Sequence, residues 1–330
     1  MASLRVLEYV RDPLAIWNLP PERLDALERQ FPDVAFVSPK DREAADRELP
    51  AADVVYGWAV RPHNFASARR LKWIHVSAAG VGPLLFREMV ESDVILTNGR
   101  GLHSEAMAEH TLAVMFAFAR KLHLARDAQR ERRWTQNELW GEAPPFRELA
   151  GTALGLLGMG AVGGAIASRA RALGMTVRAI VRNPRPDPAP AHELWPGSRL
   201  PELASISDWL VLAAPLTPAT TGILGREVIA RIPGHALLVN LGRGGLVDEP
   251  ALIEALERRT LGGAALDVFA KEPLPAESPL WNLPHVILTP HVSGLGPHYW
   301  ERATTMFADN LRAFLAGRPL ANVVDKREGY

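Results

Sequence analysis

The chain has 330 residues, of which 48% are hydrophobic and 22% are charged, and its formal net charge is +0. This composition is typical of globular proteins, and the length favours two domains. The neutral charge argues against partners such as nucleic acid or an anionic membrane, and the absence of cysteine excludes disulfides, thiolate metal sites and a thiol nucleophile.

The first residues and the apolar segments predict a soluble, cytoplasmic protein. The N-terminal sequence MASLRVLEYVRD lacks the long apolar stretch of a signal peptide and is predicted to begin a strand. The longest apolar run, TLAVMFAFA at 111–119, is too short to span a bilayer.

Short apolar runs alternate with helical patterns through the first hundred residues. The segment 20–31 is predicted to be a helix with proline in its first turn. Because strands and helices alternate, we expect a parallel sheet covered on both faces. The predicted strands lie at 4–10, 34–39, 52–60, 71–79 and 93–99.

A long helix is predicted next, with Ser104 as its N-cap and an end near Arg133. Its apolar first half should be buried. Its second half, RKLHLARDAQRERR, is charged, but acidic residues interrupt the basic ones. We therefore interpret it as a solvated helix face rather than a nucleic-acid-binding arm.

A second alternating series follows. The proline-rich stretch NPRPDPAPAHELWPG at 183–197 is expected to be a surface loop, and a last helix is predicted at roughly 297–316. The predicted strands lie at 152–158, 176–181, 209–215, 236–242, 262–269 and 285–291.

Gly158, Gly160 and Gly163 have the G-x-G-x-x-G spacing of a dinucleotide-binding turn. The motif follows a predicted strand and opens a predicted helix at 161–173, which is the context it requires. Gly158 would permit a tight turn, Gly160 close approach of a pyrophosphate, and Gly163 close packing of helix on strand. The alternative is a glycine-rich turn that binds nothing.

The end of the next strand indicates which dinucleotide is preferred. NAD sites usually carry an acidic residue there, which binds the ribose 2′-hydroxyl. Here Val181 stands at that place, Arg182 and Asn183 follow, and the first acid is Asp187. Since an arginine pairs with a 2′-phosphate, we predict NADP(H) as the favoured cofactor and NAD(H) as the alternative. Arg182 would otherwise be a solvated side chain.

Three polar side chains stand at the carboxyl ends of three later predicted strands: Arg243 and Glu272 come just after their strands, and His291 is the last residue of its strand. Ligands bind at the carboxyl ends of the strands in open parallel sheets. An arginine binds a carboxylate bidentately, and a histidine carries a proton near neutral pH. A carboxylate on the other ring nitrogen of that histidine fixes its tautomer. Arginine and imidazolium supply the positive charge, so no metal is expected.

Five segments, in this order and spacing, resemble the D-isomer-specific 2-hydroxyacid dehydrogenase family: GLLGMGAVGGAIA, APLTPATTGILG, VNLGRGGLVDEPALIEAL, AALDVFAKEPLP and LTPHVSG. The segment TNGRGLHSEAMAEHTLAVMFAFAR resembles the first interdomain helix of that family. The resemblance is strong from about 94 to 294 and weaker over the first 70 residues.

The resemblance implies a Rossmann-type cofactor domain at 102–294, inserted into a flavodoxin-like substrate domain made of 1–101 and 295–330. It implies a homodimer formed through the cofactor domain. It further implies that Asp267 contacts the nicotinamide carboxamide and that Arg243, Glu272 and His291 are catalytic. The substrate would bind to Ala79, Gly80, Val81, Arg243 and His291. The cofactor would bind to Gly158, Met159, Gly160, Ala161, Val162, Gly163, Arg182, Asn183, Pro215, Thr220, Leu241 and Asp267.

Other residues are expected to be structural. Packing is the default role for Trp58, Trp134 and Trp140, although any of them could line a pocket, the last two in a dimer partner. His103 and His110 share a helix face without a metal-binding pattern. Gly294 occupies a position where some relatives carry tryptophan.

The predicted activity is reduction of a small 2-keto acid, such as glyoxylate or hydroxypyruvate, to the D-2-hydroxy acid. Glu272 argues against a formate dehydrogenase, and the chain end at 330 argues against phosphoglycerate dehydrogenases with a C-terminal effector domain. One alternative is NAD-dependent oxidation of a D-2-hydroxy acid or of another small anion such as phosphite. Another is a dinucleotide-sensing binding protein that resembles a transcriptional co-repressor.

Overall fold

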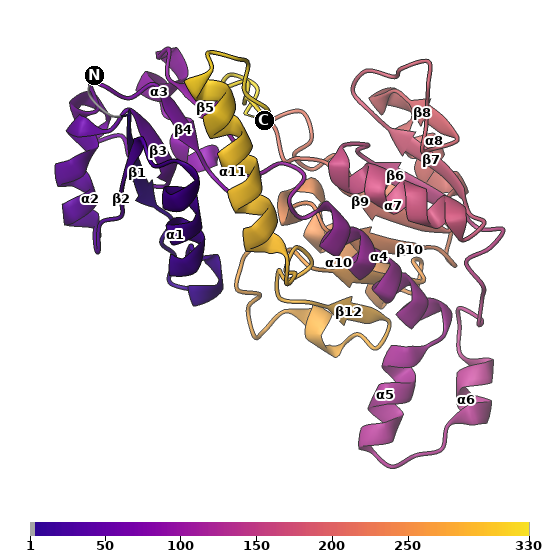
Figure 1. The fold of residues 1–330 in the computed structure, drawn as a ribbon. Helices are drawn as coiled ribbons and strands as arrows, with labels where there is room; N and C mark the ends of the chain where they lie inside the picture. The colour runs from indigo at the N-terminus through magenta and orange to yellow at the C-terminus, as the bar shows by residue number, and fades with distance from the viewer. Residues whose placement is uncertain (1–3, 330) are drawn as a thin grey trace. The chain divides into compact units, whose positions relative to one another are not determined.

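The computed structural model describes residues 4–329, which form two compact units (Figure 1). One unit comprises Met1–Leu102 and Gly296–Tyr330, so both ends of the chain belong to it. The other comprises His103–Leu295. Each crossing between the units falls one residue later than the boundary expected from the sequence.

The first unit contains a five-stranded sheet in the order β2-β1-β3-β4-β5, in which every pair is parallel. This is the flavodoxin-like order, with its switch point between β1 and β3. All five strands predicted here are present. They are shorter than predicted because residues at one or both ends of each predicted run lie outside the strand. Their bounds are β1 Leu4–Tyr9, β2 Val34–Val37, β3 Val54–Gly57, β4 Trp73–His75 and β5 Ile95–Thr97.

Helices cover both faces of this sheet. On one face, Ala45 of α2 (Arg42–Glu48) and Met89 of α3 (Arg87–Glu91) belong to a buried cluster. On the other, Leu27 of α1 (Pro21–Gln30) and Phe307 of α11 (Tyr299–Leu315) are buried. The Phe307 ring stacks on Tyr56 of β3, with 4.2 Å between centroids. The last helix of the chain therefore completes the core of the first unit.

The second unit contains a seven-stranded sheet in the order β12-β11-β10-β9-β6-β7-β8, again with every pair parallel. Counted from β6, this is the Rossmann order with one added strand, and its switch point lies between β6 and β9. The fold class predicted from the sequence is confirmed. The bounds are β6 Ala153–Leu157, β7 Thr176–Ile180, β8 Glu193–Trp195, β9 Trp209–Leu212, β10 Leu237–Asn240, β11 Gly263–Leu266 and β12 Val286–Leu288.

Two layers of helices cover this sheet as well. Buried residues of α4 (Ser104–Ala119) and α7 (Ala161–Ala172) belong to the cluster on one face. Buried residues of α8 (Leu200–Ile206), α9 (Arg226–Ile229) and α10 (Glu249–Glu257) belong to the cluster on the other. Within residues 4–329, no helix combines the length and apolarity needed to cross a membrane.

The proline-rich stretch 183–197 is not only a loop, as the sequence predicts, because it ends in strand β8. Arg178 of β7 pairs with Glu193 across the two strands, with a 2.8 Å contact between Nε and Oε1. Trp195 is buried against the core of the unit. The strand itself contains no proline, but the prolines on both sides of it, Pro190 and Pro196, made the whole stretch look like a loop in the sequence.

The single long helix predicted from Ser104 to Arg133 is wrong. His103, not Ser104, is the N-cap of α4, and a separate helix α5 runs over Leu122–Arg130. Lys121, whose backbone is left-handed (φ 52°), separates these two helices. Its buried ammonium donates to the carbonyls of Leu139, at 2.6 Å, and Glu142, at the end of α6 (Gln136–Gly141). The helices α5 and α6 project from the rest of the second unit (Figure 1).

Candidate active site

The glycine turn connects β6 to α7, and each glycine meets a different constraint. Gly158 has φ +99°, a conformation that side chains disfavour. A Cβ on Gly163 would lie 2.2 Å from the carbonyl oxygen of Gly158, so only glycine lets the helix pack on the turn. A Cβ on Gly160, by contrast, would meet nothing within 4 Å.

That open space lies at the N-terminus of α7, where Gly160 is the N-cap. The first N–H groups of a helix have no partner within the helix, and they favour an anion. An unobstructed N-cap glycine leaves room for a phosphate to approach these groups. The turn therefore fits the pyrophosphate of a dinucleotide, with Met159, Ala161 and Val162 completing the predicted set.

The chain past β7 carries Arg182 and Asn183, which are both exposed, directly after the half-buried Val181. Gly158 donates its N–H to the carbonyl of Ile180 at 3.0 Å, which places this strand end beside the glycine turn. The nearest acid in sequence, Asp187, accepts the N–H of Ala189 at 2.9 Å within its own turn. Arg182 thus follows the strand end where a ribose 2′-phosphate is recognised in this fold.

The predicted cofactor residues Pro215 and Thr220 form one loop after β9. The Thr220 hydroxyl donates to the Pro215 carbonyl at 2.7 Å and accepts the Thr217 N–H at 2.8 Å. The Thr220 side chain therefore stabilises the conformation of this loop. Leu241, another predicted cofactor residue, is buried in the core, so only its backbone remains for such a contact.

His291 and Glu272 meet at the same sheet edge. The Nδ1 atom of His291 lies 2.8 Å from Oε2 of Glu272, and the other carboxylate oxygen accepts the N–H of Phe269 at 3.0 Å. Since a carboxylate accepts hydrogen bonds, Nδ1 carries the hydrogen. The remaining nitrogen, Nε2, is then the atom that gives or takes a proton.

The backbone of His291 is left-handed, with φ 53°. For a residue with a Cβ this conformation costs about 1–2 kcal/mol, so the surrounding structure has to impose it. The N–H of His291 donates to the Asp267 carbonyl at 2.9 Å. The imidazole is therefore aimed by a turn that is held against the end of β11.

Asp267 is 1% exposed, and its carboxylate is engaged within the protein. One oxygen accepts the Thr289 hydroxyl at 2.6 Å and the Val292 N–H at 2.9 Å, and the other accepts the Ser293 N–H at 3.0 Å. Burial raises the pKa of Asp267, but bonds from Ser293, Thr289 and Val292 outweigh burial and lower it below its ordinary value. The predicted contact between Asp267 and the nicotinamide carboxamide stays a prediction.

Arg243 lies just past β10, at the N-terminus of a short 3-10 helix, and it is exposed. Its Nη1 donates to the carbonyl of Gly242 at 2.7 Å. A Cβ on Gly244 would lie 2.0 Å from the carbonyl of Phe269. The arginine loop therefore packs directly on the segment that leads to Glu272, and this close approach requires glycine.

Two histidines that are expected from the sequence to be structural lie beside this site. Nδ1 of His103 lies 2.9 Å from the Gly294 carbonyl. Burial lowers the pKa of His103, and the charges of Arg243 and His291 lower it further against the opposing effect of the Gly294 bond. The ring is thus neutral and close to both residues. Nε2 of His110 lies 3.3 Å from the Thr289 hydroxyl, which connects α4 to Asp267.

The predicted substrate-binding loop belongs to the first unit and follows β4. Ala79 and Gly80 are exposed, whereas Val81 is buried. The Asn98 side chain donates to the Ala79 carbonyl at 2.7 Å, and the Gly99 N–H donates to the Ala78 carbonyl at 2.9 Å. The loop is therefore held firmly at its base while its tip is open.

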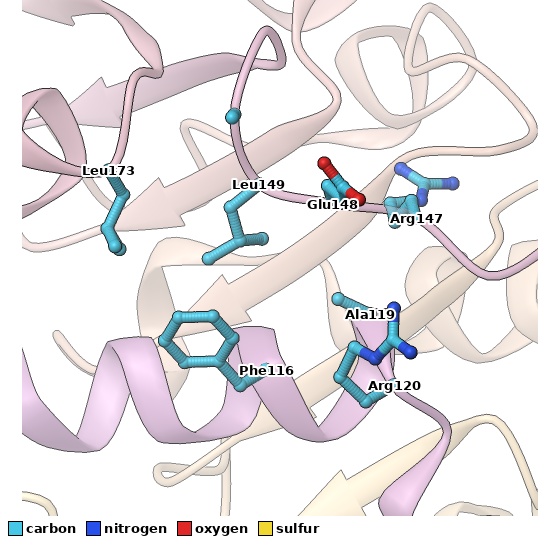
Figure 2. A pocket seen from close by; sticks show the side chains of 8 residues that line it. Phe116, Ala119, Arg120, Arg147, Glu148, Leu149 and Leu173 are labelled. Carbon is cyan, nitrogen blue, oxygen red and sulfur yellow. The ribbon is translucent and has the colours of Figure 1, made fainter.

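A hollow on the second unit lies apart from these residues (Figure 2). Phe116 of α4, Leu149 and Leu173 form its apolar part, and Arg120 and Arg147 lie at one side. None of the residues predicted for the site lines it. Trp58, for which the sequence allows a role as a pocket wall, is half-buried after β3.

A Rossmann-type sheet with this glycine turn defines a dinucleotide-binding protein, and comparison with known proteins extends the assignment. Residues 112–293 match the family model described as D-isomer specific 2-hydroxyacid dehydrogenase, NAD binding domain. The glycerate dehydrogenase of Methylorubrum extorquens is 34% identical over 262 residues, which cover 77% of this chain and 79% of that enzyme.

Two solved structures are similar over nearly whole chains. A D-isomer specific 2-hydroxyacid dehydrogenase from Xanthobacter autotrophicus, in complex with NADPH and MES, has a TM-score of 0.81 and 30% identity over 100% of both chains. An NADPH-dependent glyoxylate/hydroxypyruvate reductase from Sinorhizobium meliloti, in complex with NADP and sulfate, has a TM-score of 0.81 and 28% identity, and covers 99% of this chain and 100% of that one.

The chain belongs to the D-isomer specific 2-hydroxyacid dehydrogenase family, a family of NAD(P)-dependent oxidoreductases. It spans about half the length of the D-3-phosphoglycerate dehydrogenases that it matches. The enzyme from Methanocaldococcus jannaschii, for example, is 34% identical over 287 residues, and these are 54% of its length.

Proposed function

We propose that the protein reduces a small 2-keto acid to the D-2-hydroxy acid with NAD(P)H. The observation that carries this proposal is the 2.8 Å pair of His291 and Glu272 at the sheet edge that also bears Arg243 and the glycine turn. A bound reduced nicotinamide supplies the hydride that such a reduction adds to C2. The protein has to bind the acid, polarise its keto group and supply one proton.

Three side chains divide these tasks. Arg243 binds the substrate carboxylate with two parallel N–H donors and polarises the neighbouring keto oxygen. His291 donates the proton on Nε2 to that oxygen as the C2–H bond forms, so the keto group becomes a hydroxyl. Glu272 accepts a hydrogen bond from Nδ1–H, which holds the tautomer and stabilises the imidazolium before transfer. Oxidation runs through the same groups in reverse.

Ala79, Gly80 and Val81 stay the predicted substrate-binding residues of the first unit. Glyoxylate and hydroxypyruvate are the substrates we propose first. The similarity to a glycerate dehydrogenase and to a glyoxylate/hydroxypyruvate reductase supports this choice.

A panel of 2-keto acids, each assayed with NADPH and with NADH by loss of nicotinamide absorbance, tests the proposed function. We expect turnover on the order of 1 s⁻¹ or faster with the best acid. Oxidation of phosphite or of a D-2-hydroxy acid without measurable reduction would support the oxidative alternative. Dinucleotide binding with no turnover of any compound would support the sensor.

We also propose NADP(H) as the preferred cofactor, because Arg182 stands where an NAD site carries an acid. Both solved structures described above contain NADPH or NADP. Replacement of Arg182 by alanine should lower kcat/KM with NADPH by about 10- to 100-fold, since a bond to a charged phosphate is lost. The value with NADH should stay nearly constant.

Arg185→Ala is the matched control for this change. Arg185 lies in the same loop, but its guanidinium donates to the carbonyls of Asp187 and Ala189. The control should keep the wild-type preference. An unchanged NADPH/NADH ratio in Arg182→Ala would show that another group recognises the cofactor.

A homodimer formed through the second unit is also proposed. Trp134 lies between α5 and α6, Trp140 lies in α6, and the two residues are 90% and 78% exposed. Packing within the chain, the default expectation from the sequence, therefore buries neither side chain, although the Trp140 ring stacks on Phe146 with 6.5 Å between centroids. A second copy of the chain would remove this apolar surface from water. Light scattering of the purified protein tests the dimer, and the mass of one chain would contradict it.

A further inference from the structure

The turn that carries His291 is attached to Asp267 at four points. The Asp267 carbonyl accepts the His291 N–H at 2.9 Å. Its carboxylate accepts the Thr289 hydroxyl at 2.6 Å, the Val292 N–H at 2.9 Å and the Ser293 N–H at 3.0 Å. The bonded groups lie on both sides of His291 in sequence. The residue that bears the imidazole is thus enclosed between contacts to a single aspartate.

These four bonds stabilise the unfavourable backbone conformation of His291. With φ 53°, that backbone is unfavourable for a residue with a Cβ. Two consecutive N–H groups, those of Val292 and Ser293, point at the same carboxylate directly after it. Bonds from N–H groups to an ionised carboxylate are stronger than neutral ones, so they can hold the chain in this turn.

The Thr289 hydroxyl extends the arrangement to α4. Because this hydroxyl donates to Asp267 at 2.6 Å, its 3.3 Å contact with His110 has the Nε2–H of the imidazole as donor. Burial lowers the pKa of His110, with a partly opposing effect of Asp267, so the ring is neutral near pH 7. A helix of the core therefore supports the turn through Thr289.

We infer that Asp267 is a positioning residue, whose carboxylate holds the turn 289–293 so that the His291 ring stays on Glu272 and its Nε2 faces the reacting oxygen. This inference rests on the proposed role of His291. If Asp267 only contacted the cofactor, its replacement would instead weaken cofactor binding without disturbing the imidazole.

Asp267→Asn is the first test. The amide keeps the volume of the side chain but places an NH2 group against one of the N–H donors of the turn. We expect kcat for 2-keto acid reduction to fall by about 10²-fold, as for a reacting group misplaced by roughly 1 Å. The Kd of NADPH, measured by fluorescence titration, should remain near the wild-type value.

Thr289 provides a matched pair if Asp267→Asn fails to fold. Thr289→Val keeps the shape and removes the hydroxyl donor, whereas Thr289→Ser keeps the donor. The valine variant should lower kcat in the same direction as Asp267→Asn, and the serine variant should restore it close to wild type. Equal activities of the two variants would show that the hydroxyl does not support the turn.

A double-mutant cycle with His291→Asn decides whether Asp267 acts through the imidazole. If it does, adding Asp267→Asn to His291→Asn should leave kcat unchanged. A further fall by the full single-mutant factor would overturn the inference. So would a raised Kd for NADPH with kcat preserved, which is the signature of a cofactor contact only.

A spectroscopic readout separates this inference from the proposed function. In the holo protein, the hydrogen-bonded Nδ1–H proton of His291 should give a downfield NMR signal, assigned by its absence in His291→Asn. The signal should be lost in Asp267→Asn and in Glu272→Gln. A protein that reduces no 2-keto acid but shows these losses would contradict the proposed function and keep the positioning role. An intact signal in Asp267→Asn would contradict the positioning role.

Discussion

Replacement of His291 by alanine is expected to lower kcat for 2-keto acid reduction by about 10²- to 10⁴-fold, the usual contribution of a general acid. The proton on Nε2 has no substitute within the pair, because Glu272 uses one oxygen for His291 and the other for the Phe269 N–H. Binding of NADPH should persist, since the glycine turn is formed by a different part of the second unit.

His291→Asn improves this test. Asparagine adopts a left-handed backbone more readily than alanine, so it preserves the turn while removing the acid. The matched control is His298→Ala, since His298 also pairs with a glutamate, Glu301, at 3.2 Å, but in the first unit. The control should retain wild-type kcat. Near-normal turnover of both His291 variants would remove this imidazole from the mechanism.

Replacement of Arg243 by lysine is expected to lower kcat/KM by about 10²- to 10³-fold, as for loss of a donor to the charge that develops on the reacting oxygen. The positive charge is kept, but an ammonium cannot bind a carboxylate with two parallel bonds. The fall should be present with every 2-keto acid of the panel, because all carry the same carboxylate.

Arg258→Lys is a control with the same chemical change on the surface. Arg258 forms an exposed ion pair with Glu254 at 3.0 Å, and such pairs contribute little. It should leave both kcat and KM unaltered. If Arg243→Lys behaves like this control, Arg243 is not the carboxylate anchor.

Features that depend on neighbours in sequence could be predicted. Apolar runs separated by turns revealed eleven of the strands, and the glycine spacing identified the turn before α7. Arg243, Glu272 and His291 could be proposed because each stands at the carboxyl end of a predicted strand, and parallel strands end at one edge. The structure shows the pairing of His291 with Glu272 that this reasoning required.

Features that depend on contacts between distant segments could not be predicted. Strand β8 is short and preceded by prolines, and it is stabilised by its neighbour β7 and by burial of Trp195. The break at Lys121 depends on carbonyls of Leu139 and Glu142, which no periodicity reveals. Both errors arise where tertiary contacts outweigh local preference.

The candidate active site was likewise predictable only in part. The sequence indicated that His291 is functional, but not that Thr289 and Ser293 would bond to Asp267. The left-handed backbone of His291 has no signal in the sequence, because histidine does not require it. Three-dimensional contacts were needed to show how the imidazole is held.

The most direct test of the central claim follows a labelled hydride into a chiral product. The purified protein would be incubated with hydroxypyruvate and NADPH that carries deuterium at both hydrogen positions on C4 of the nicotinamide. Arg243, His291 and Glu272 acting as described predict D-glycerate with deuterium at C2, formed in many turnovers per protein. Formation of L-glycerate, or no turnover of any 2-keto acid with either cofactor, would contradict it.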